Sequence, residues 1–510
     1  MATSMKGGFA LTLKRFRSTF KLLMRSKLAI VGLILLIMFA FAAIAAPLLT
    51  PYDPEKSIVA GAAVPPDWTK YLPGSEHYSE NMVFSSDPGF SNPASANGWD
   101  IIGPTNITQF IHTSYNPDGF PGDSGSMDIN YSRTTPFSSS SGQSVYTFDV
   151  NRQFRYPYSG PPIRFVAGVA IRVLGSSSAE PVDVRLVMQK VGVSTTKWVL
   201  YSSPMFNTTD SGWTTPTIGL DSSLKDFRDL MGLQFSSFSP AEIIFPTAGD
   251  YRYSVEVTFK DLGTSTTKNV LVRVDQLSLK LYGSVYGLFG SDGGGRDLFT
   301  QFIYGSRISL AVGLVSAFVG ISLGLVVGLL AGFLGKMVDE TLMRFTDMML
   351  VIPGLPLLIV LVAILGPSFI NLILVLGLLG WMGFARVVRS QVLSLKERPF
   401  IEASRAAGAG SGHILLRHIM PNIVSLTYVN LALTVPGSIL GEAALSFLGL
   451  GDPTTISWGR ILNNAETSGG LSQWFWVIPP GLGIAAVSLS FVLIGFALDE
   501  LFNPKLRLRR

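Results

Sequence analysis

The sequence Arg-Pro-Phe-Ile-Glu-Ala-Ser-Arg-Ala-Ala-Gly at residues 398–408, which continues to Pro421, separates two long apolar runs. Lysine and arginine residues surround it, as is typical of a cytoplasmic loop between membrane spans. Its first part favours a short helix of small side chains, Gly408 interrupts that helix, and Ser411 allows a second helix up to Pro421. The stretch pairs no nucleophile with a base, so it suits docking against another protein better than catalysis.

Composition places the chain in a membrane. The 510 residues are 47% hydrophobic and only 14% charged, and the mean hydropathy is +0.39. The absence of cysteine excludes disulfides, thiolate zinc sites and cysteine nucleophiles, and four histidines leave little material for a metal centre. The Gly-x-x-x-x-Gly-Lys-Ser/Thr phosphate loop is also absent, so we expect no cofactor and no ATP hydrolysis by this chain.

The N-terminal part predicts a retained first span. Residues 1–47 carry seven Lys or Arg and no Asp or Glu, which favours a cytoplasmic N-terminus over nucleic-acid binding. The apolar run at 28–46 has about the length that crosses a bilayer. A cleaved signal peptide would open in the same way, but this run lies late and reaches Pro47 without a clear small-residue cleavage site.

Residues 55–285 predict an extracytoplasmic β-rich domain, which we interpret as a β-sandwich. The segment is rich in Ser, Thr, Pro, Gly and aromatic residues and contains no membrane-length apolar run. Residues 251–259 alternate with period two, and strands are also expected at 145–150, 163–174, 182–191, 197–201 and 269–282. Its opening part, about 55–140, lacks periodicity and predicts long loops.

Residues 286–510 predict five further spans, at 309–334, 348–365, 370–384, 424–445 and 476–497. Together with residues 1–54 they make an all-α polytopic membrane protein of six helices, with both chain ends in the cytoplasm. Small residues every four positions let helices approach closely in lipid, so the first of the five predicts a buried helix. The residues concerned are Gly320, Gly324, Gly328 and Gly332.

The loop resembles the cytoplasmic coupling loop of binding-protein-dependent ABC transporter permeases. Glu402-Ala403-Ser404 stands where that family usually has Glu-Ala-Ala, Gly408 follows at the family's distance, and the stretch ends in Ile-x-Pro at Pro421. Further motifs, in the family's order, resemble the C-type subunit of the dipeptide/oligopeptide/nickel permeases. They lie at 15–53, 290–297, 304–310, 445–451 and 457–459. The insert 55–285 departs from that family, which commonly has a short connection there.

The resemblance implies a permease subunit of an ABC importer of peptides or related solutes. A second homologous permease would complete the pathway, and two ATPase subunits would bind the loop 398–421 from the cytoplasm. An extracytoplasmic solute-binding protein would deliver the substrate, and no nucleic acid is involved. The alternative is a surface receptor or adhesin with helices as its anchor. The glycine repeat, the proline-broken spans and the coupling loop disfavour it, and no residue identifies the solute or, apart from the resemblance, the direction of transport.

Several charged residues stand out. The resemblance implies that the loop, with Glu402 and Arg405, sits in a cleft of the ATPase; Glu402 at a helix start also suits the helix dipole. Asp347 and Glu442 lie in or near spans, where charges are expensive; we expect either gating or structural roles, with Arg344 as a partner for Asp347. Arg386 and Arg389 are expected to be snorkelling anchors. Arg296 and Asp297 are expected to fix an outer element, pairing with each other or with the second permease.

Overall fold

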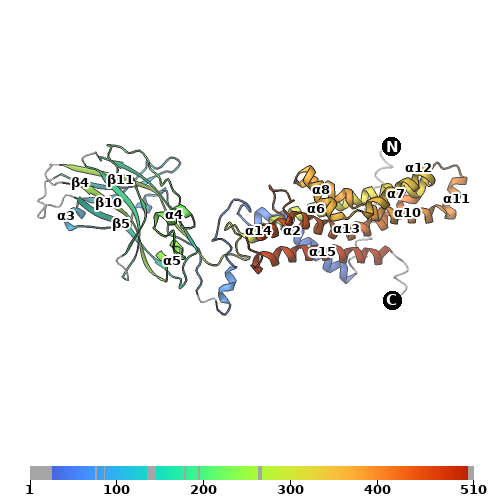
Figure 1. Cartoon of the computed structure of the whole chain (residues 1–510), viewed down its shortest axis with the longest axis horizontal. Coiled ribbons are helices and arrows are strands. Elements are labelled where there is room, and N and C mark those ends of the chain that lie inside the picture. Colours follow the sequence, from blue (N-terminus) through green and yellow to red (C-terminus); the bar gives the residue numbers. More distant parts are fainter. Residues whose placement is uncertain are drawn as a thin grey trace. The chain divides into compact units, whose positions relative to one another are not determined.

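The computed structural model describes residues 24, 26–74, 77–85, 87–134, 145–176, 180–192, 196–261 and 267–502. The chain forms two compact units (Figure 1). Residues 1–58 with 296–510 are the helical unit, and Val59–Gly295 is the β unit. Apart from Lys27, the basic residues that predict cytoplasmic chain ends lie outside the described residues.

The described part of the β unit contains a six-stranded and a five-stranded sheet, in which all the pairings are antiparallel. The first has the order β3-β4-β11-β6-β9 with β1 beside β11, and the second the order β2-β5-β10-β7-β8. The strands are β1 (Met82–Val83), β2 (Asp100–Ile102), β3 (Ile111–Asn116), β4 (Ser126–Arg133), β5 (Val145–Tyr156), β6 (Arg164–Leu174), β7 (Val182–Lys190), β8 (Lys197–Ser202), β9 (Leu220–Asp221), β10 (Gly249–Lys260) and β11 (Lys268–Tyr282). Three short helices connect them: α3 (Thr105–Thr108), α4 (Lys225–Leu230) and α5 (Pro240–Ile244).

One hydrophobic core is shared by the two sheets. Tyr131 of β4 in the first sheet and Phe259 of β10 in the second have ring centroids 4.6 Å apart. The period-two pattern of β10 works as expected, because Tyr251, Tyr253 and Val255 all point into this core.

The prediction of long loops over 55–140 is wrong for the part that forms β3 and β4. The sequence of β4 lacks an alternation of apolar and polar residues, because charged residues on this strand are buried and paired. Asp128 accepts a 2.8 Å hydrogen bond from Arg273 Nε, and Arg133 pairs with Asp261 at 3.0 Å. Such pairs remove the apolar alternation without removing the strand.

The helical unit holds four helices that are long and apolar enough to cross a membrane, within the described residues. They are α2 (Lys27–Leu49), α6 (Leu298–Leu334), the run Ser411–Phe447 made of α12 (Ser411–Ile414), a π-helical turn (Leu415–Ile419) and α13 (Met420–Phe447), and α15 (Trp474–Phe502). Shorter helices are α7 (Lys336–Val351), α8 (Gly354–Leu365), α9 (Phe369–Leu379), α10 (Met382–Lys396), α11 (Pro399–Ala406) and α14 (Trp458–Thr467).

Two of the expected spans are bent pairs of helices. α7 and α8 meet at 91°, and α9 and α10 meet at 41°, so the count of six holds only if each pair is one span. Pro353 precedes α8 and ends the first helix of its pair, since the residue before a proline avoids helical geometry. A hydropathy profile does not detect such a bend, because the residues on both sides of it are apolar.

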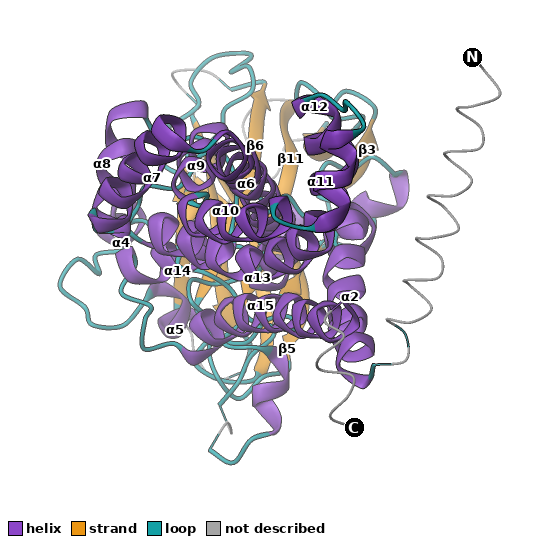
Figure 2. Cartoon of the chain, turned by 90° about the vertical axis from the view of Figure 1, so that its right-hand side faces the viewer, coloured by secondary structure: helices purple, strands orange, loops and turns teal. Residues whose placement is uncertain are grey.

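Glycines bring α6 against α9 and α10 (Figure 2). A β-carbon on Gly320 would lie 3.1 Å from the carbonyl oxygen of Gly377 in α9. One on Gly328 would lie 2.5 Å from the carbonyl oxygen of Ala385, and one on Gly332 2.7 Å from Val392 Cβ. A β-carbon on Gly324 would lie 2.7 Å from the carbonyl oxygen of Trp381. The absence of side chains at this spacing therefore permits the contact.

Candidate functional site

The loop 398–421 forms two short helices at the end of α10. Arg398 is the N-cap of α11 and Pro399 its first residue, a position that needs no N–H donor. The helix ends in a Schellman motif: the Gly408 N–H donates to Arg405 O at 3.0 Å and the Ala409 N–H to Ser404 O at 3.1 Å. Gly408 has φ +84°, a conformation that favours glycine.

The second helix does not stop at Pro421. α12 passes through the π-helical turn into α13, and Pro421 lies in the first turn of α13. A π-helical turn changes the hydrogen-bond pattern at the point where proline lacks its N–H, so the helix continues. The prediction that this helix ends at Pro421 is therefore wrong.

Three isoleucines of the loop pack against α6 and α10. Ile401, Ile414 and Ile419 are buried in one cluster with residues of α6 and α10. Ser404 adds a polar link between the two short helices, because its Oγ lies 3.3 Å from His418 Nε2. Alanine, which the family usually has at this place, could not make that contact.

The opposite side of the loop is open. Glu402, Ala403 and Arg405 are exposed, and so are the apolar side chains of Phe400 and Leu416. Within the described residues the carboxylate of Glu402 makes no hydrogen bond and no ion pair, and only its backbone N–H is bonded, to Arg398 O at 3.3 Å. An exposed apolar pair beside an unpartnered carboxylate gives a surface suited to binding a partner.

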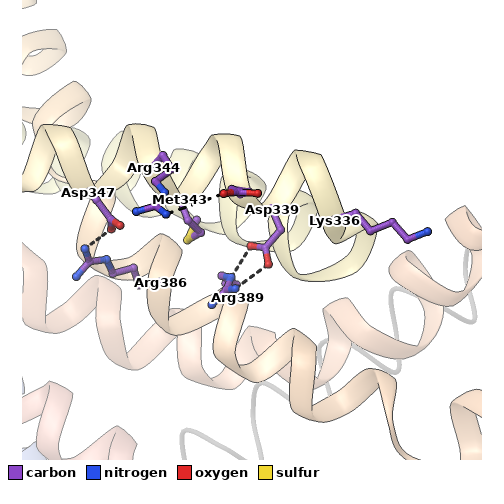
Figure 3. A pocket seen from close by; sticks show the side chains of 8 residues that line it. Lys336, Asp339, Met343, Arg344, Asp347, Arg386 and Arg389 are labelled. Atoms are coloured by element: carbon purple, nitrogen blue, oxygen red, sulfur yellow. Dashed lines mark hydrogen bonds and ion pairs between the residues drawn. The ribbon is translucent and has the colours of Figure 1, made fainter.

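Ion pairs join α7 to α10, the helix that leads into the loop. Arg389 Nε and Nη2 donate to the two carboxylate oxygens of Asp339 at 2.5 and 2.7 Å, and Arg386 pairs with Asp347 (Figure 3). The order of the pairs is reversed along the two helices, so α7 and α10 are antiparallel. The four residues line an open pocket of about 540 Å³.

These contacts differ from the sequence expectations in two ways. Arg344 lies 4.0 Å from Glu340, whereas Asp347 pairs with Arg386 on the facing helix. Arg386 and Arg389 are ion-pair partners as well as basic residues near a span end. The sequence analysis did not identify Asp339, the partner of Arg389. The spacing of Asp339, Met343 and Asp347 at i, i+4 and i+8 places them on one helix face and could have indicated it.

Glu442 is buried where α13 meets α6. Ser309 Oγ donates to Glu442 Oε2 at 3.1 Å and Ser446 Oγ to Oε1 at 2.7 Å. Ser309 Oγ also accepts the backbone N–H of Trp458 at 3.3 Å. Hydroxyl donors thus satisfy the carboxyl group and link α6, α13 and α14.

Polar contacts also join the end of α2 and the start of α6 to α14. Asp297 is the N-cap of α6 and accepts hydrogen bonds from the Thr300 N–H and Oγ1, at 2.9 and 2.6 Å. Thr300 Oγ1 lies 2.6 Å from Thr50 Oγ1, next to the end of α2. Arg296 donates to the backbone oxygen of Glu55 at 3.4 Å, and the Glu55 carboxylate pairs with Arg460 of α14 at 2.5 Å.

Asp452 holds the start of α9 from the loop that follows α13. Its Oδ2 accepts the Phe369 N–H at 2.9 Å and its Oδ1 accepts the Thr454 N–H at 2.8 Å. Burial raises the pKa of Asp452, but the hydrogen bonds from Thr454 and Phe369 outweigh it and leave the pKa below its ordinary value. The group is therefore an anionic anchor near neutral pH.

Known families match both parts of the helical unit. The model of the binding-protein-dependent transport system inner membrane component matches residues 320–508, and that of the N-terminal TM domain of oligopeptide transport permease C matches residues 14–71. Neither match reaches residues 72–319, which hold most of the β unit.

Curated relatives agree. A putative peptide permease protein of Brucella ovis is 38% identical over 238 residues, which cover 46% of this chain and 78% of the relative. The oligopeptide transport system permease protein OppC of Escherichia coli K12 is 40% identical over 218 residues, 42% of this chain and 72% of the relative. Among solved structures, the MetNI methionine ABC transporter in an inward-facing conformation matches at 23% identity and TM-score 0.33, over 41% of this chain and 97% of that chain.

The family models and the curated relatives decide between the two readings of the sequence. The relatives are permease components of inner-membrane transport systems, so the chain is a multi-pass transport component rather than a surface adhesin or an enzyme. ATP hydrolysis in such systems occurs on separate subunits, and a further permease and a binding protein complete them. The chain belongs to the permease subunits of binding-protein-dependent ABC importers, among those that carry the N-terminal domain of oligopeptide transport permease C.

Proposed function

We propose that this permease forms half of a pathway for peptides and that its loop 398–421 couples the pathway to ATPase subunits. The observation that supports this proposal is that one side of the loop is buried against the membrane helices and the other side is exposed. Ile401, Ile414 and Ile419 fasten it to α6 and α10, while Glu402 and Phe400 remain exposed on its other side. A push on the exposed side is then transmitted to the membrane helices, because the buried side cannot slide independently of them.

The proposed topology has six spans, counting α7–α8 and α9–α10 as one span each, with both chain ends in the cytoplasm. Lysine and arginine near each expected cytoplasmic turn support it. Residues 1–54 hold the first span, residues 55–285 an extracytoplasmic β-sandwich, and residues 286–510 the remaining spans. The shared core of the two antiparallel sheets supports the β-sandwich.

The partners follow from this topology and from the relatives. A second, homologous permease faces the helices across the pathway, two ATPase subunits bind at the cytoplasmic loops, and an extracytoplasmic solute-binding protein delivers the solute. Peptide is the proposed cargo because the relatives are peptide and oligopeptide permeases by name. Alternation between outward-open and inward-open states moves the peptide across.

The ion pairs between α7 and α10 extend this proposal to gating. α10 carries Arg386 and Arg389 and runs directly into the coupling loop. The bidentate contact of Arg389 with Asp339 is the geometry in which arginine binds carboxylates most strongly. We assign to these pairs the role of making α7 follow α10 when the ATPases close. Glu442, Asp297 and Arg296 act as structural links between helix ends.

The coupling role is tested by affinity purification of the full chain in mild detergent, with mass spectrometry of co-purifying proteins. Glu402→Arg reverses the exposed charge, and we expect at least about a tenfold loss of co-purifying ATPase, equivalent to ~1.4 kcal/mol. The second permease should remain bound. Glu397→Arg is the matched control, because Glu397 is also exposed and lies between α10 and α11, directly before the loop. Retention of the ATPase by Glu402→Arg would contradict the assignment.

The gating role is tested by charge reversal and exchange. Arg389→Asp places two carboxylates together, and we expect peptide uptake into proteoliposomes to fall strongly while ATPase binding persists. Asp339→Arg combined with Arg389→Asp restores an opposite-charge pair and should recover a large part of the uptake. If uptake by the double variant is as low as uptake by Arg389→Asp alone, the ion pair has no role in gating.

A further inference from the structure

The exposed aromatic side chains of the β unit gather at one end of it. Among the described residues of this unit, the exposed aromatic residues are Trp68, Tyr71, Phe235 and Phe238. Phe235 is 96% exposed and Tyr71 80% exposed. With the neighbouring exposed Leu230, we call these residues the aromatic end.

The strand pairing shows which end this is. Tyr282, the last residue of β11, pairs with Arg164 at the start of β6, and the next strand along, β9, pairs with Val166. α4 and the segment with Phe235 and Phe238 follow β9 directly. The chain leaves β11 at this end and continues to the helical unit.

The other two aromatic residues lie beside the same exit segment. Trp68 Nε1 donates to Leu288 O at 3.0 Å, and the Asp67 N–H donates to Gly287 O at 2.9 Å. Residues 287 and 288 lie between β11 and the end of the β unit at Gly295. All four exposed aromatic residues therefore occupy the end from which the chain runs to the membrane helices.

Chain length limits how far Gly295, the last residue of the β unit, can be from the bilayer. The apolar, exposed surface of α2 extends to Leu48, which is 89% exposed, so the hydrocarbon region reaches about this level. The Thr50–Thr300 hydrogen bond sets the start of α6 beside the end of α2. Only Arg296 and Asp297 separate Gly295 from α6, and two extended residues span less than about 10 Å.

We propose that the aromatic end of the β unit inserts into the outer leaflet, at the boundary between lipid headgroups and acyl chains. Tryptophan and tyrosine favour this boundary, and phenylalanine and leucine favour the adjoining acyl region. Lys225, Asp226, Arg228 and Asp229 of α4 balance in charge, so insertion depends on apolar side chains and not on anionic lipid. The inference rests on the membrane topology proposed above but not on ATPase coupling.

The test uses the full chain, which contains no cysteine and so accepts a single labelled one. Phe235→Cys and, separately, Phe238→Cys carry a nitroxide in proteoliposomes of phosphatidylcholine, and collision with oxygen and with a water-soluble nickel chelate is measured. Met205→Cys is the matched control. Met205 is exposed and apolar, and it precedes Phe206, which bonds to Val182 at the other end of the sheets.

We expect the oxygen-to-nickel collision ratio to be several-fold higher at positions 235 and 238 than at 205, with no further rise when phosphatidylglycerol is added. Equal ratios at all three positions would overturn the proposal, because the aromatic end would then face water. Low collision with both reagents at 235 and 238, unchanged in detergent, would overturn it in favour of a protein contact. Agreement of the two labelled positions guards against local damage by either substitution.

Discussion

The two units of this chain differ in the contacts that hold their elements together. The β unit packs large aromatic residues, among them Tyr131, Tyr251 and Tyr253, in one core. The helical unit brings α6 onto α10 through glycines such as Gly324 and Gly328. Charges follow the same division, because the β unit buries a full ion pair and the helical unit satisfies Glu442 with serine hydroxyls.

The difference reflects the two solvents. In water, removing aromatic area from solvent stabilises a fold by about 25 cal/mol per Å², so large side chains are favoured in the core. Between helices in lipid that driving force is absent, and close backbone approach and hydrogen bonds take its place. Substitutions should therefore act through lost pairing or area in the β unit and through added volume in the helical unit.

The largest effect is expected from the buried pair of Arg133 and Asp261, whose side chains are 0% and 2% exposed. Arg133→Met leaves Asp261 charged and without its cation, which should destabilise the β unit by about 3–5 kcal/mol. Urea unfolding of the full chain in detergent, followed by near-ultraviolet circular dichroism of the buried tyrosines, measures it.

A double variant separates the charge from the loss of packing. Arg133→Met with Asp261→Asn removes both charges and keeps an acceptor for the Tyr131 hydroxyl, which lies 2.8 Å from Asp261 Oδ2. It should recover most of the lost stability. If the single and double variants unfold at the same urea concentration, the penalty comes from packing and the contrast in charge burial between the units fails.

A smaller effect is expected from one added methyl group on α6. Gly328→Ala would place a β-carbon 2.5 Å from the carbonyl oxygen of Ala385 and 2.6 Å from Val388 Cβ. Backbone has to move, so we expect a loss of about 1–3 kcal/mol, seen as a lower melting temperature in detergent. Gly383→Ala is the control, because no described atom lies within 4 Å and alanine favours a helix by about 1 kcal/mol. Equal shifts for the two variants would show that the close approach is unimportant.

These contrasts also explain what the sequence can and cannot predict. β10 is predictable because Tyr251, Tyr253 and Val255 alternate with polar residues. β4 is not, because Asp128 and Arg133 are buried with partners that are distant in the sequence. The loop 398–408 is predictable because Gly408 ends a helix by local geometry alone. The partners of Asp339 and Asp347 lie on another helix, and no local pattern identifies them.

The smallest effect is expected from a part-buried pair in the β unit. Arg164 Nε donates to Asp221 Oδ1 at 2.8 Å, and the Ser223 N–H donates to the same oxygen at 3.0 Å. Burial raises the pKa of Asp221, but the bonds from Arg164 and Ser223 outweigh it and leave the pKa below its ordinary value. The folded state thus binds this proton less readily than the unfolded state does. The stabilisation is full above the ordinary aspartate pKa and is lost as pH falls through the lower, folded value.

Asp221→Asn should lower the stability of the β unit near neutral pH by about 1 kcal/mol and flatten its acid dependence, in the same circular dichroism assay. Asp149 supplies the opposite sign, because burial, only partly offset by Lys197, raises its pKa. Its ionised form costs stability, so Asp149→Asn should be neutral or stabilising near neutral pH and should remove a contribution that grows on acidification. Matching acid dependence in the two variants would mean that neither carboxyl group controls the response, and that the pairs Arg164–Asp221 and Lys197–Asp149 contribute no more than exposed ion pairs do.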